Sequence, residues 1–386
     1  KNGNWDALDT WTTDPSGTTL EGSAIPGQYD RAVILNGRDI DITTSNKTVG
    51  IVEIRDGGNL DLTNTTGHTF SSFLGRGYLK LSTGSLPAGN MDAFVSESGG
   101  TIEFYGGSSF DFNRNVFNNL ILNLNSTATT ASVNEDFTIN GDLTIERGTF
   151  RIGTNNNARI VNANKSIYVK PNGRITIGGN SIEHSLYIKG DFDINGAVSF
   201  TTRTNPNYLE DNGGRANVIF NNSTSNQSVD INASAIFYRI GIDKGVDDTY
   251  ILNLDASNSE FFKIYGPNNK QTNTPSTPAP SIPNNNAINL LAGTLRIGKN
   301  IIIPSIGSSN DDSNYGSKLY LIDSDCQLWI DGGSVFSTSF TNNRRLVAIA
   351  IYGKLKITSG ELNDISEQGL LLRNTGQLII EDGIVN

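Results

Sequence analysis

Gly58-Asn59-Leu60-Asp61-Leu62 is followed 19 residues later by a second copy of the same pattern, Gly77-Tyr78-Leu79-Lys80-Leu81. Each copy is a glycine followed by alternating polar and apolar residues, which is the period of a β-strand with one buried face. Further copies begin at Gly100, Gly141, Gly173, Gly190, Gly293, Gly353 and Gly376. A strand that returns about every 20 residues, with Gly or Asn at the corners, predicts a parallel β-solenoid whose coils pair through their backbones.

The alternative is a series of antiparallel sandwiches, whose strands recur every 8 to 12 residues and are joined by Asn-Gly or Asp-Gly hairpins. Such dipeptides occur at 36–37, 56–57, 140–141, 172–173, 195–196 and 382–383. The repeated unit recurs at about twice the sandwich spacing, and no segment shows a sustained helical period. We therefore predict an all-β parallel β-helix of roughly 15 coils, with almost no α-helix.

Three segments depart from the repeat. Residues 1–45 contain Trp5 and Trp11, and we predict that they form an N-terminal cap and the first strands. Residues 46–386 are predicted to be the β-helix itself, interrupted at 267–287 by a surface loop that holds five of the eleven prolines. The last repeat, Gln377-Leu378-Ile379-Ile380, has no polar cap after it. This arrangement predicts that the solenoid continues beyond residue 386 in a longer protein.

Composition narrows the function classes. The 386 residues carry a formal net charge of −10, which argues against a nucleic-acid partner because such partners require a basic surface. The densest basic pair, Arg344-Arg345, is predicted to be a solvated loop. No apolar run is long enough to span a membrane as a helix. Cys326 is the only cysteine, so an internal disulfide is excluded, and a thiol-poor chain is typical of exported proteins.

The sequence offers little catalytic chemistry. His68 and His184 are the only histidines, neither lies in a motif, and we predict surface or corner positions for both. No zinc helix, phosphate-binding loop or nucleophile elbow is present, so no catalytic or cofactor-binding residues are predicted. The calcium candidates Asp247-Asp248, Asp311-Asp312 and Asp323/Asp325 lack a full ligand series, so metal binding stays open and solvated acidic loops are favoured.

Two patterns keep a carbohydrate-related function open. Alternation places Asp191 and Asp193, and Asp61 with Asp39 and Asp41, on the outer face, where paired carboxylates could act on polysaccharides. The tyrosines predicted to point outward, which could stack on sugars, are Tyr168, Tyr187 and Tyr320. Outward acids are also expected on any acidic surface. The prediction is therefore a non-enzymatic chain, with a β-helical polysaccharide lyase or hydrolase, or a glycan-binding module, as the alternatives.

The opening of the chain resembles the β-helical repeat regions of large cell-surface adhesins of the Bacteroidota, including adhesins of gliding motility. The residues that carry the resemblance are Gly3-Asn4-Trp5, Trp11, Pro26-Gly27, Asp30, Val33-Ile34, Gly37, Ile40-Asp41-Ile42, Thr48 to Ile54 and Gly58-Asn59-Leu60, with later copies at 119–124 and 148–153. The resemblance implies a right-handed β-helix, export by the type IX secretion system and a location outside the outer membrane. It also implies a rigid display stalk for attachment or gliding, with surface glycans and the secretion and gliding machinery as partners. No nucleic-acid partner and no membrane span are expected.

Overall fold

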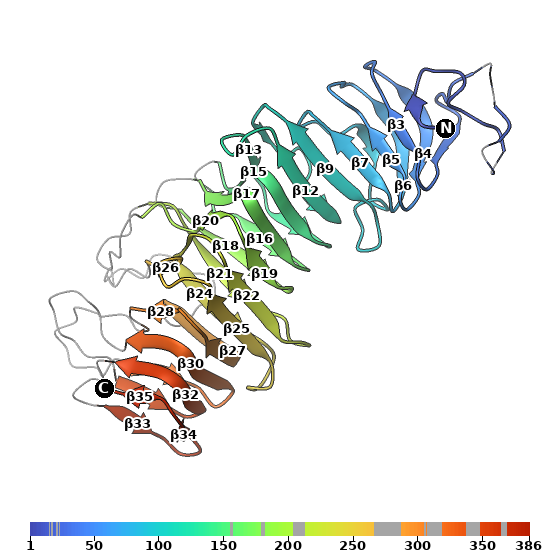
Figure 1. Ribbon diagram of the computed structural model, residues 1–386. Helices are drawn as coiled ribbons and strands as arrows, with labels where there is room; N and C mark the ends of the chain where they lie inside the picture. Colours follow the sequence, from blue (N-terminus) through green and yellow to red (C-terminus); the bar gives the residue numbers. More distant parts are fainter. Residues whose placement is uncertain are drawn as a thin grey trace. The chain divides into compact units, whose positions relative to one another are not determined.

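The computed structural model describes residues 1–14, 16, 18–20, 22, 24–154, 157–178, 182–203, 213–265, 287–304, 306, 319–336, 348–363 and 369–386. Within these ranges every regular element is a β-strand, and the strands within each sheet pair in parallel (Figure 1). The predicted all-β parallel β-helix is therefore confirmed. The predicted loop 267–287 lies outside the described residues except for Ala287, and Arg344-Arg345 and Asp311-Asp312 lie outside them altogether.

The strands are short and follow one another along the whole chain. Those in the first part are β1 (Gly3–Asn4), β2 (Arg31–Ile34), β3 (Asp39–Asp41), β4 (Thr48–Ile54), β5 (Asn59–Asp61), β6 (Thr69–Gly75), β7 (Tyr78–Leu81), β8 (Ala88–Asn90), β9 (Thr101–Gly106), β10 (Phe110–Asp111), β11 (Val116–Phe117), β12 (Asn119–Leu124), β13 (Thr130–Val133), β14 (Phe137–Ile139), β15 (Leu143–Ile152), β16 (Ile160–Ala163) and β17 (Ile167–Ile177). Those that follow are β18 (Glu183–Ile188), β19 (Phe192–Ile194), β20 (Ala197–Ser199), β21 (Arg215–Phe220), β22 (Gln227–Ile231), β23 (Ala235–Phe237), β24 (Arg239–Asp243), β25 (Ile251–Ala256), β26 (Phe262–Ile264), β27 (Ile288–Ile297), β28 (Ile302–Ile303), β29 (Leu319–Ile322), β30 (Cys326–Phe336), β31 (Ala348–Ile351), β32 (Lys354–Asn363), β33 (Leu370–Leu372), β34 (Gln377–Ile380) and β35 (Ile384–Val385).

The chain divides into two compact units. The first consists of Lys1–Arg151, Asn162–Lys165 and Asn172–Arg174, and the second of Ile152–Val161, Ser166–Pro171 and Ile175–Asn386. In the first unit one row of inward residues runs from Ile40 to Leu60, Leu79, Ile102, Leu120 and Leu143 in successive coils. One coil therefore takes 18 to 23 residues there, which is the period that the glycine repeat indicates.

In the second unit a corresponding row runs through Leu254, Ile297, Ile330, Ile357 and Ile380. Its steps shorten from 43 residues between the first two members to 23 between the last two. The strands stay in parallel register although the connections between them differ in length. Insertions are thus accommodated at the corners, where they leave the backbone ladders in place.

Side chains on the inner face fill the core of each unit with aliphatic and aromatic rows. In the first unit Phe104, Phe112, Phe117, Phe137 and Phe150 form a chain of ring contacts with centroids 4.9 to 6.2 Å apart. All five rings are buried. Phe117 and Phe137 are stacked, and the other pairs meet edge-on or tilted, which are favourable arrangements for buried rings.

Glycine is required where a strand passes close to the preceding coil. Gly75 ends β6 with φ +101°, and a Cβ atom there would lie 2.0 Å from the carbonyl oxygen of Ile54. No other residue fits that approach without moving the backbone. The same demand applies to Gly77, the glycine that precedes the repeated strand β7, because a Cβ atom there would lie 2.4 Å from the backbone oxygen of Arg55.

Two tryptophans lie at the N-terminal end of the core. Trp5 is completely buried, meets Trp11 edge-on at 4.7 Å between ring centroids, and stacks on Phe70 at 6.3 Å. The indole N–H of Trp11 donates to the backbone oxygen of Trp5 at 2.8 Å. The final coil differs, since Leu378 and Ile380 are 39% and 47% exposed although they continue a row that is buried in the coil before.

Candidate functional site

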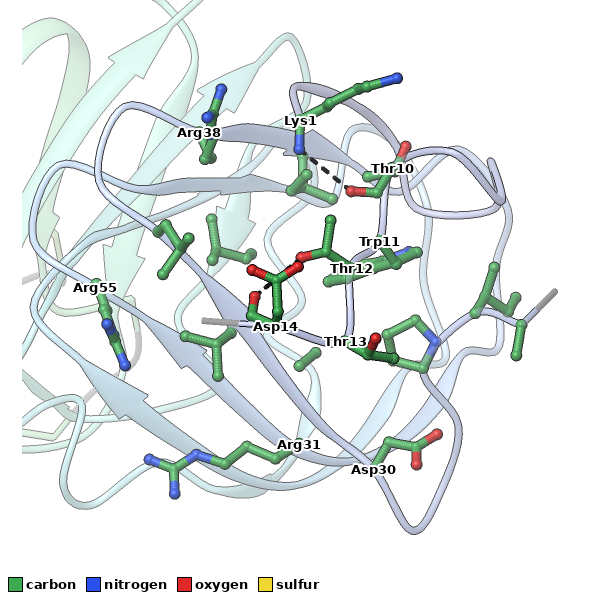
Figure 2. A pocket seen from close by; sticks show the side chains of 18 residues that line it. Lys1, Thr10, Trp11, Thr12, Thr13, Asp14, Asp30, Arg31, Arg38 and Arg55 are labelled. Carbon is green, nitrogen blue, oxygen red and sulfur yellow. Dashed lines mark hydrogen bonds between the residues drawn. The ribbon is translucent and has the colours of Figure 1, made fainter. Parts of the chain in front are cut away.

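A cavity of about 560 Å³ lies beside the N-terminal cap (Figure 2). It borders β2, the edge strand of the four-stranded sheet β2-β4-β6-β8, and Trp11 forms part of its wall. The lining residues are Lys1, Thr10, Trp11, Thr12, Thr13, Asp14, Ala24, Ile25, Pro26, Asp30, Arg31, Ala32, Val33, Ile34, Leu35, Arg38, Ile40 and Arg55. The lining thus combines apolar side chains of the first coil with several charged groups.

The charged groups around this cavity are held by neighbouring residues. Hydrogen bonds from Ser16 and from the backbone of Thr19 lower the pKa of the Asp14 carboxyl well below its usual range. Arg31 and Arg55 both contact Glu53, at 2.6 Å and 3.3 Å. General acid–base catalysis needs a group whose pKa lies near the working pH. The Asp14 carboxylate does not meet that requirement, so it supplies no proton at neutral pH.

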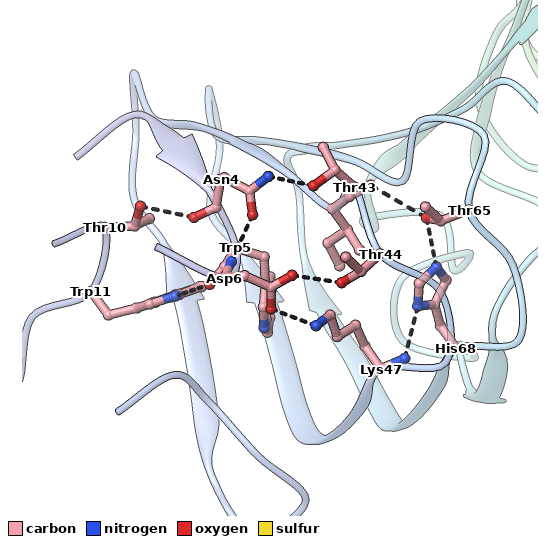
Figure 3. Close-up of polar contacts among 11 residues, drawn as sticks. Asn4, Trp5, Asp6, Thr10, Trp11, Thr43, Thr44, Lys47, Thr65 and His68 are labelled. Carbon is pink, nitrogen blue, oxygen red and sulfur yellow. Dashed lines mark hydrogen bonds and ion pairs between the residues drawn. The ribbon is translucent and has the colours of Figure 1, made fainter. Parts of the chain in front are cut away.

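Next to the cavity, a polar network ties the cap to the following coils (Figure 3). Asn4 donates to Thr43, and Asp6 accepts from Thr44 and from the Lys47 ammonium group. Burial alone would raise the pKa of Asp6, but these hydrogen bonds and the Lys47 charge lower it. The network keeps Asp6 ionised. Its hydrogen bonds connect Asn4 and Asp6 of the cap to residues 43–47.

His68 lies at the corner just before β6, whereas His184 is the second residue of β18, so the predicted corner position holds for His68 only and a surface position is wrong for both. His68 and His184 are 3% and 0% exposed. Their ring nitrogens form hydrogen bonds with backbone and hydroxyl groups, so these polar rings are buried without unpaired ring nitrogens. The pKa of each is lowered, mainly by burial, with further lowering by Lys47 at His68 and by Arg159 and Arg215 at His184.

The first predicted carboxylate group does point outward. Asp39 and Asp41 stand opposite Asn59 and Asp61 of the next coil. The Tyr105 hydroxyl donates to both Asp61 oxygens, at 2.7 and 2.9 Å. Burial and the charges of Asp61 and Asp39 raise the pKa of Asp41.

The second predicted pair, Asp191 and Asp193, is engaged in structural hydrogen bonds. Asp191 accepts from the backbone N–H of Ser228 at 2.7 Å, and Asp193 accepts from the Asn195 amide at 2.7 Å. Both bonds fix local backbone or corner conformation.

The remaining calcium candidates that the structure describes take part in hydrogen bonds or an ion pair. Asp247 accepts from the backbone of Thr249, Asp248 pairs with Lys354, and Asp323 and Asp325 both contact Ser324. Within the described residues, no three His, Cys, Asp or Glu side chains are grouped closely enough to hold a metal ion.

The three predicted outward tyrosines separate into two groups. Tyr168 and Tyr187 are half-buried on outward positions. Tyr320 is buried, and its hydroxyl donates to the backbone oxygen of Ile288 at 3.2 Å, so the prediction that it points outward is wrong. Nearby Cys326 is buried as well, and burial with the charges of Asp323 and Asp325 raises the pKa of its thiol to about 12.

Sequence reasoning missed an outer-face cluster in the second unit, built around Trp329. Arg296 and Lys356 lie in register on either side of Trp329, 5.6 and 5.0 Å from its ring centroid. Arg296 also pairs with Asp255 at 2.8 Å and with Asp331 at 2.7 Å. The signal in the sequence was that Trp329 lies between Leu328 and Ile330, which face inward. Alternation therefore places the Trp329 ring on the outer face, where water contacts it unless neighbouring side chains cover it.

A buried lysine was also missed. Lys244 is fully buried, and its ammonium group donates to the backbone oxygens of Asn222 and Ser225 and to the Gln227 side chain, at 3.1, 3.0 and 2.7 Å. Burial lowers the pKa of Lys244 to about 8, and the charge of Asp191 opposes that effect. The three oxygens match the three donors of an ammonium ion, so Lys244 fastens the turn above it.

Comparison with known proteins yields no relative: no family model, no curated protein sequence and no solved structure matches this chain. Among the described residues no helix is long and apolar enough to cross a membrane. The fold therefore defines the chain as a long, all-parallel β-solenoid. Its described polar contacts mostly connect one coil to the next.

Proposed function

We propose that this chain is a non-catalytic structural and display segment of a large secreted cell-surface adhesin. The observation that carries the proposal is that the notable polar groups of the described coils bond to neighbouring coils. His68, His184, Lys244 and the Trp329 cluster all do so. A catalytic surface would instead keep such groups available to a substrate.

A segment of this kind would resist extension by two means. Each coil pairs with the next through parallel backbone hydrogen bonds, so separating two coils requires breaking a whole set of bonds. Contacts such as that between Arg296 and Asp331 add charge-assisted bonds across the same junctions. The net charge of −10 would keep neighbouring segments apart in solution.

The cellular setting of the proposal comes from the resemblance to Bacteroidota adhesins. In this proposal the chain lies outside the outer membrane, is exported by the type IX secretion system and serves attachment or gliding. Surface glycans and the secretion and gliding machinery are the proposed partners. The shortage of cysteine is compatible with an extracellular setting.

Labelling of intact cells tests this proposal. An antibody against this chain should bind intact cells of the source organism, and an in-frame deletion of residues 213–363 should reduce attachment to surfaces. In parallel, the purified chain should release no new reducing or unsaturated ends from a panel of acidic and neutral polysaccharides. Antigen detected only after lysis, or turnover that stops when one outward carboxylate is replaced, would contradict the proposal.

A glycan-binding module is the second candidate, favoured by Tyr78. This ring is 37% exposed on the outer face and stands between Asn59 and Thr101 of the adjacent coils. An aromatic face beside amide and hydroxyl groups suits sugar binding. Glycan-array binding that Tyr78→Ala abolishes, and that Tyr168→Ala leaves intact, would support this function, and an array without signal would count against it.

A further inference from the structure

His68 and Thr69 together form hydrogen bonds with both backbone polar groups of Lys47 in the preceding coil. The backbone N–H of Lys47 donates to Nδ1 of His68 at 3.2 Å, and the N–H of Thr69 donates to the backbone oxygen of Lys47 at 2.8 Å. Both backbone groups of Lys47 are thus bonded by two consecutive residues that follow 21 and 22 positions later. The ring of His68 also stacks on Phe70, 5.7 Å between centroids.

His184 and Ser185 form the same pair of hydrogen bonds, with the backbone of Arg159, in the second unit. The N–H of Arg159 donates to Nδ1 of His184 at 3.1 Å, and the N–H of Ser185 donates to the Arg159 oxygen at 2.9 Å. His68 immediately precedes β6, and His184 is the second residue of β18. The chain has only two histidines, and both hold a corner of the preceding coil in the same way.

Hydrogen bonding fixes the same tautomer in both rings. Nε2 of His184 faces the Gly178 backbone oxygen at 3.1 Å, which can only accept, so the proton sits on Nε2. Nε2 of His68 lies 2.8 Å from Thr65 Oγ1, whose own proton goes to the Leu62 oxygen. In each ring Nδ1 therefore carries the lone pair that receives the backbone N–H.

Protonation of Nδ1 would break the hydrogen bond that each histidine accepts from the backbone N–H of Lys47 or Arg159. A proton on Nδ1 places an N–H donor against the N–H of Lys47 or Arg159, and a hydrogen bond becomes a repulsion. The charges that face the rings oppose protonation in the closed corner. They are Lys47, itself paired with Asp6, at His68, and Arg159 with Arg215, itself paired with Glu183, at His184.

We propose that His68 with Lys47, and His184 with Arg159, are proton-sensitive clamps, and that mild acid opens these two corners while the strand ladders stay intact. We name these two contacts the histidine clamps. The inference goes beyond the proposed display function and does not depend on it. The expected pH response is a property of the folded chain itself, so it does not depend on where the protein is located.

The direction and size of the response follow from linkage. In an open corner the imidazole regains its ordinary pKa of 6.5, whereas in the closed corner the pKa is lower. The open form therefore binds more protons below pH 6.5, and opening becomes more favourable as the pH falls. Each pH unit raises the opening equilibrium of each clamp by up to about tenfold, until the pKa of the closed form is reached. The carboxyl pKa values of Asp6 and Glu183 are lowered, so neither group competes in this range.

Amide hydrogen exchange measures the clamps directly. Between pH 6.5 and 5.0, protection at the Lys47 and Arg159 amides, corrected for the intrinsic pH dependence of exchange, should fall by up to about 15-fold. The amides of Val52 and Val218, in the ladders of the two units, should keep their protection. Protection at Lys47 and Arg159 that stays constant over this range, or that falls equally at all four amides, would overturn the proposal.

Two substitutions separate the clamp from a general effect of acid. His68→Asn places an amide oxygen near the position of Nδ1, where it accepts the Lys47 N–H but cannot titrate. Protection at Lys47 should then become independent of pH, while Arg159 in the same protein keeps its response. His184→Asn should show the reverse. His68→Phe removes the acceptor and should leave Lys47 weakly protected at both pH values. A pH response at Lys47 that survives in His68→Asn would refute the assignment, whether or not His68→Phe folds.

Discussion

Replacing Trp5 with alanine tests whether the cap stabilises the first unit. Trp5 is fully buried, meets Trp11 edge-on and stacks on Phe70. Truncating a large buried aromatic side chain to alanine costs about 3–5 kcal/mol, because the cavity left behind refills only in part. Little recovery is expected here, since Trp11 is held through its bond to the backbone oxygen of residue 5, which the substitution retains.

The loss should be local. In a repeat architecture each coil contacts only its neighbours, so a weakened cap destabilises nearby coils most. Hydrogen exchange should show lower protection in β2, β4 and β6 and unchanged protection in β30 and β32. Leu8→Ala is the matched control, because Leu8 belongs to the same cap but is 46% exposed, and it should cost well under 1 kcal/mol. An equal loss of protection in both units, or a Trp5→Ala protein as stable as the control, would refute this reasoning.

Three further changes test other contacts. Gly75→Ala should cost about 2–5 kcal/mol in chemical denaturation, because its Cβ would meet the Ile54 oxygen, whereas Gly37→Ala, with positive φ but open space around it, should cost about 1 kcal/mol; equal costs would contradict the steric argument. Stability should rise between pH 8 and 10.5, because the unfolded chain keeps the Lys244 proton that the folded chain loses at about pH 8. Lys244→Met should flatten that rise, and a rise that persists would assign it to another group. Asp331→Asn should cost about 0.5–1 kcal/mol in urea unfolding, since it removes one of the two acidic partners of a half-buried arginine, and no measurable loss would show that the other partner suffices.

The fold class could be predicted from the sequence because it depends on a periodic signal. Alternation in segments such as 58–62 specifies which side chains face inward, and close backbone approach requires glycine at positions such as Gly75. Both signals recur often enough that insertions do not hide them. Trp5 and Trp11 are both buried, which fits large apolar side chains placed ahead of the first repeat.

The errors have physical causes that the sequence does not display. Tyr320 belongs to the run Leu319-Tyr320-Leu321-Ile322, which is apolar at every position, so alternation cannot decide which side chains point inward. For Tyr168, between the buried Ile167 and Val169, the same rule gives the correct answer. The histidines and Lys244 were misjudged or missed because polar side chains become buried only where the backbone of another coil supplies partners. Those partners lie about one coil away, at distances that vary with each insertion.

These polar contacts also specify the register of the strands, which the apolar core specifies only weakly. The inward rows consist of similar residues, so a strand displaced by two positions would still place Leu or Ile over Leu or Ile, and apolar packing alone specifies the register weakly. A unique polar pair is satisfied in one register only. Tyr105 reaches Asp61, Arg296 reaches Asp331, and His68 reaches the Lys47 backbone only when the strands align as they do. Each such pair contributes modestly to stability, yet a displaced strand would leave its buried groups without partners, at a cost of about 1–3 kcal/mol per group. Polar pairs of this kind therefore favour one alignment of the coils over its near-equivalents.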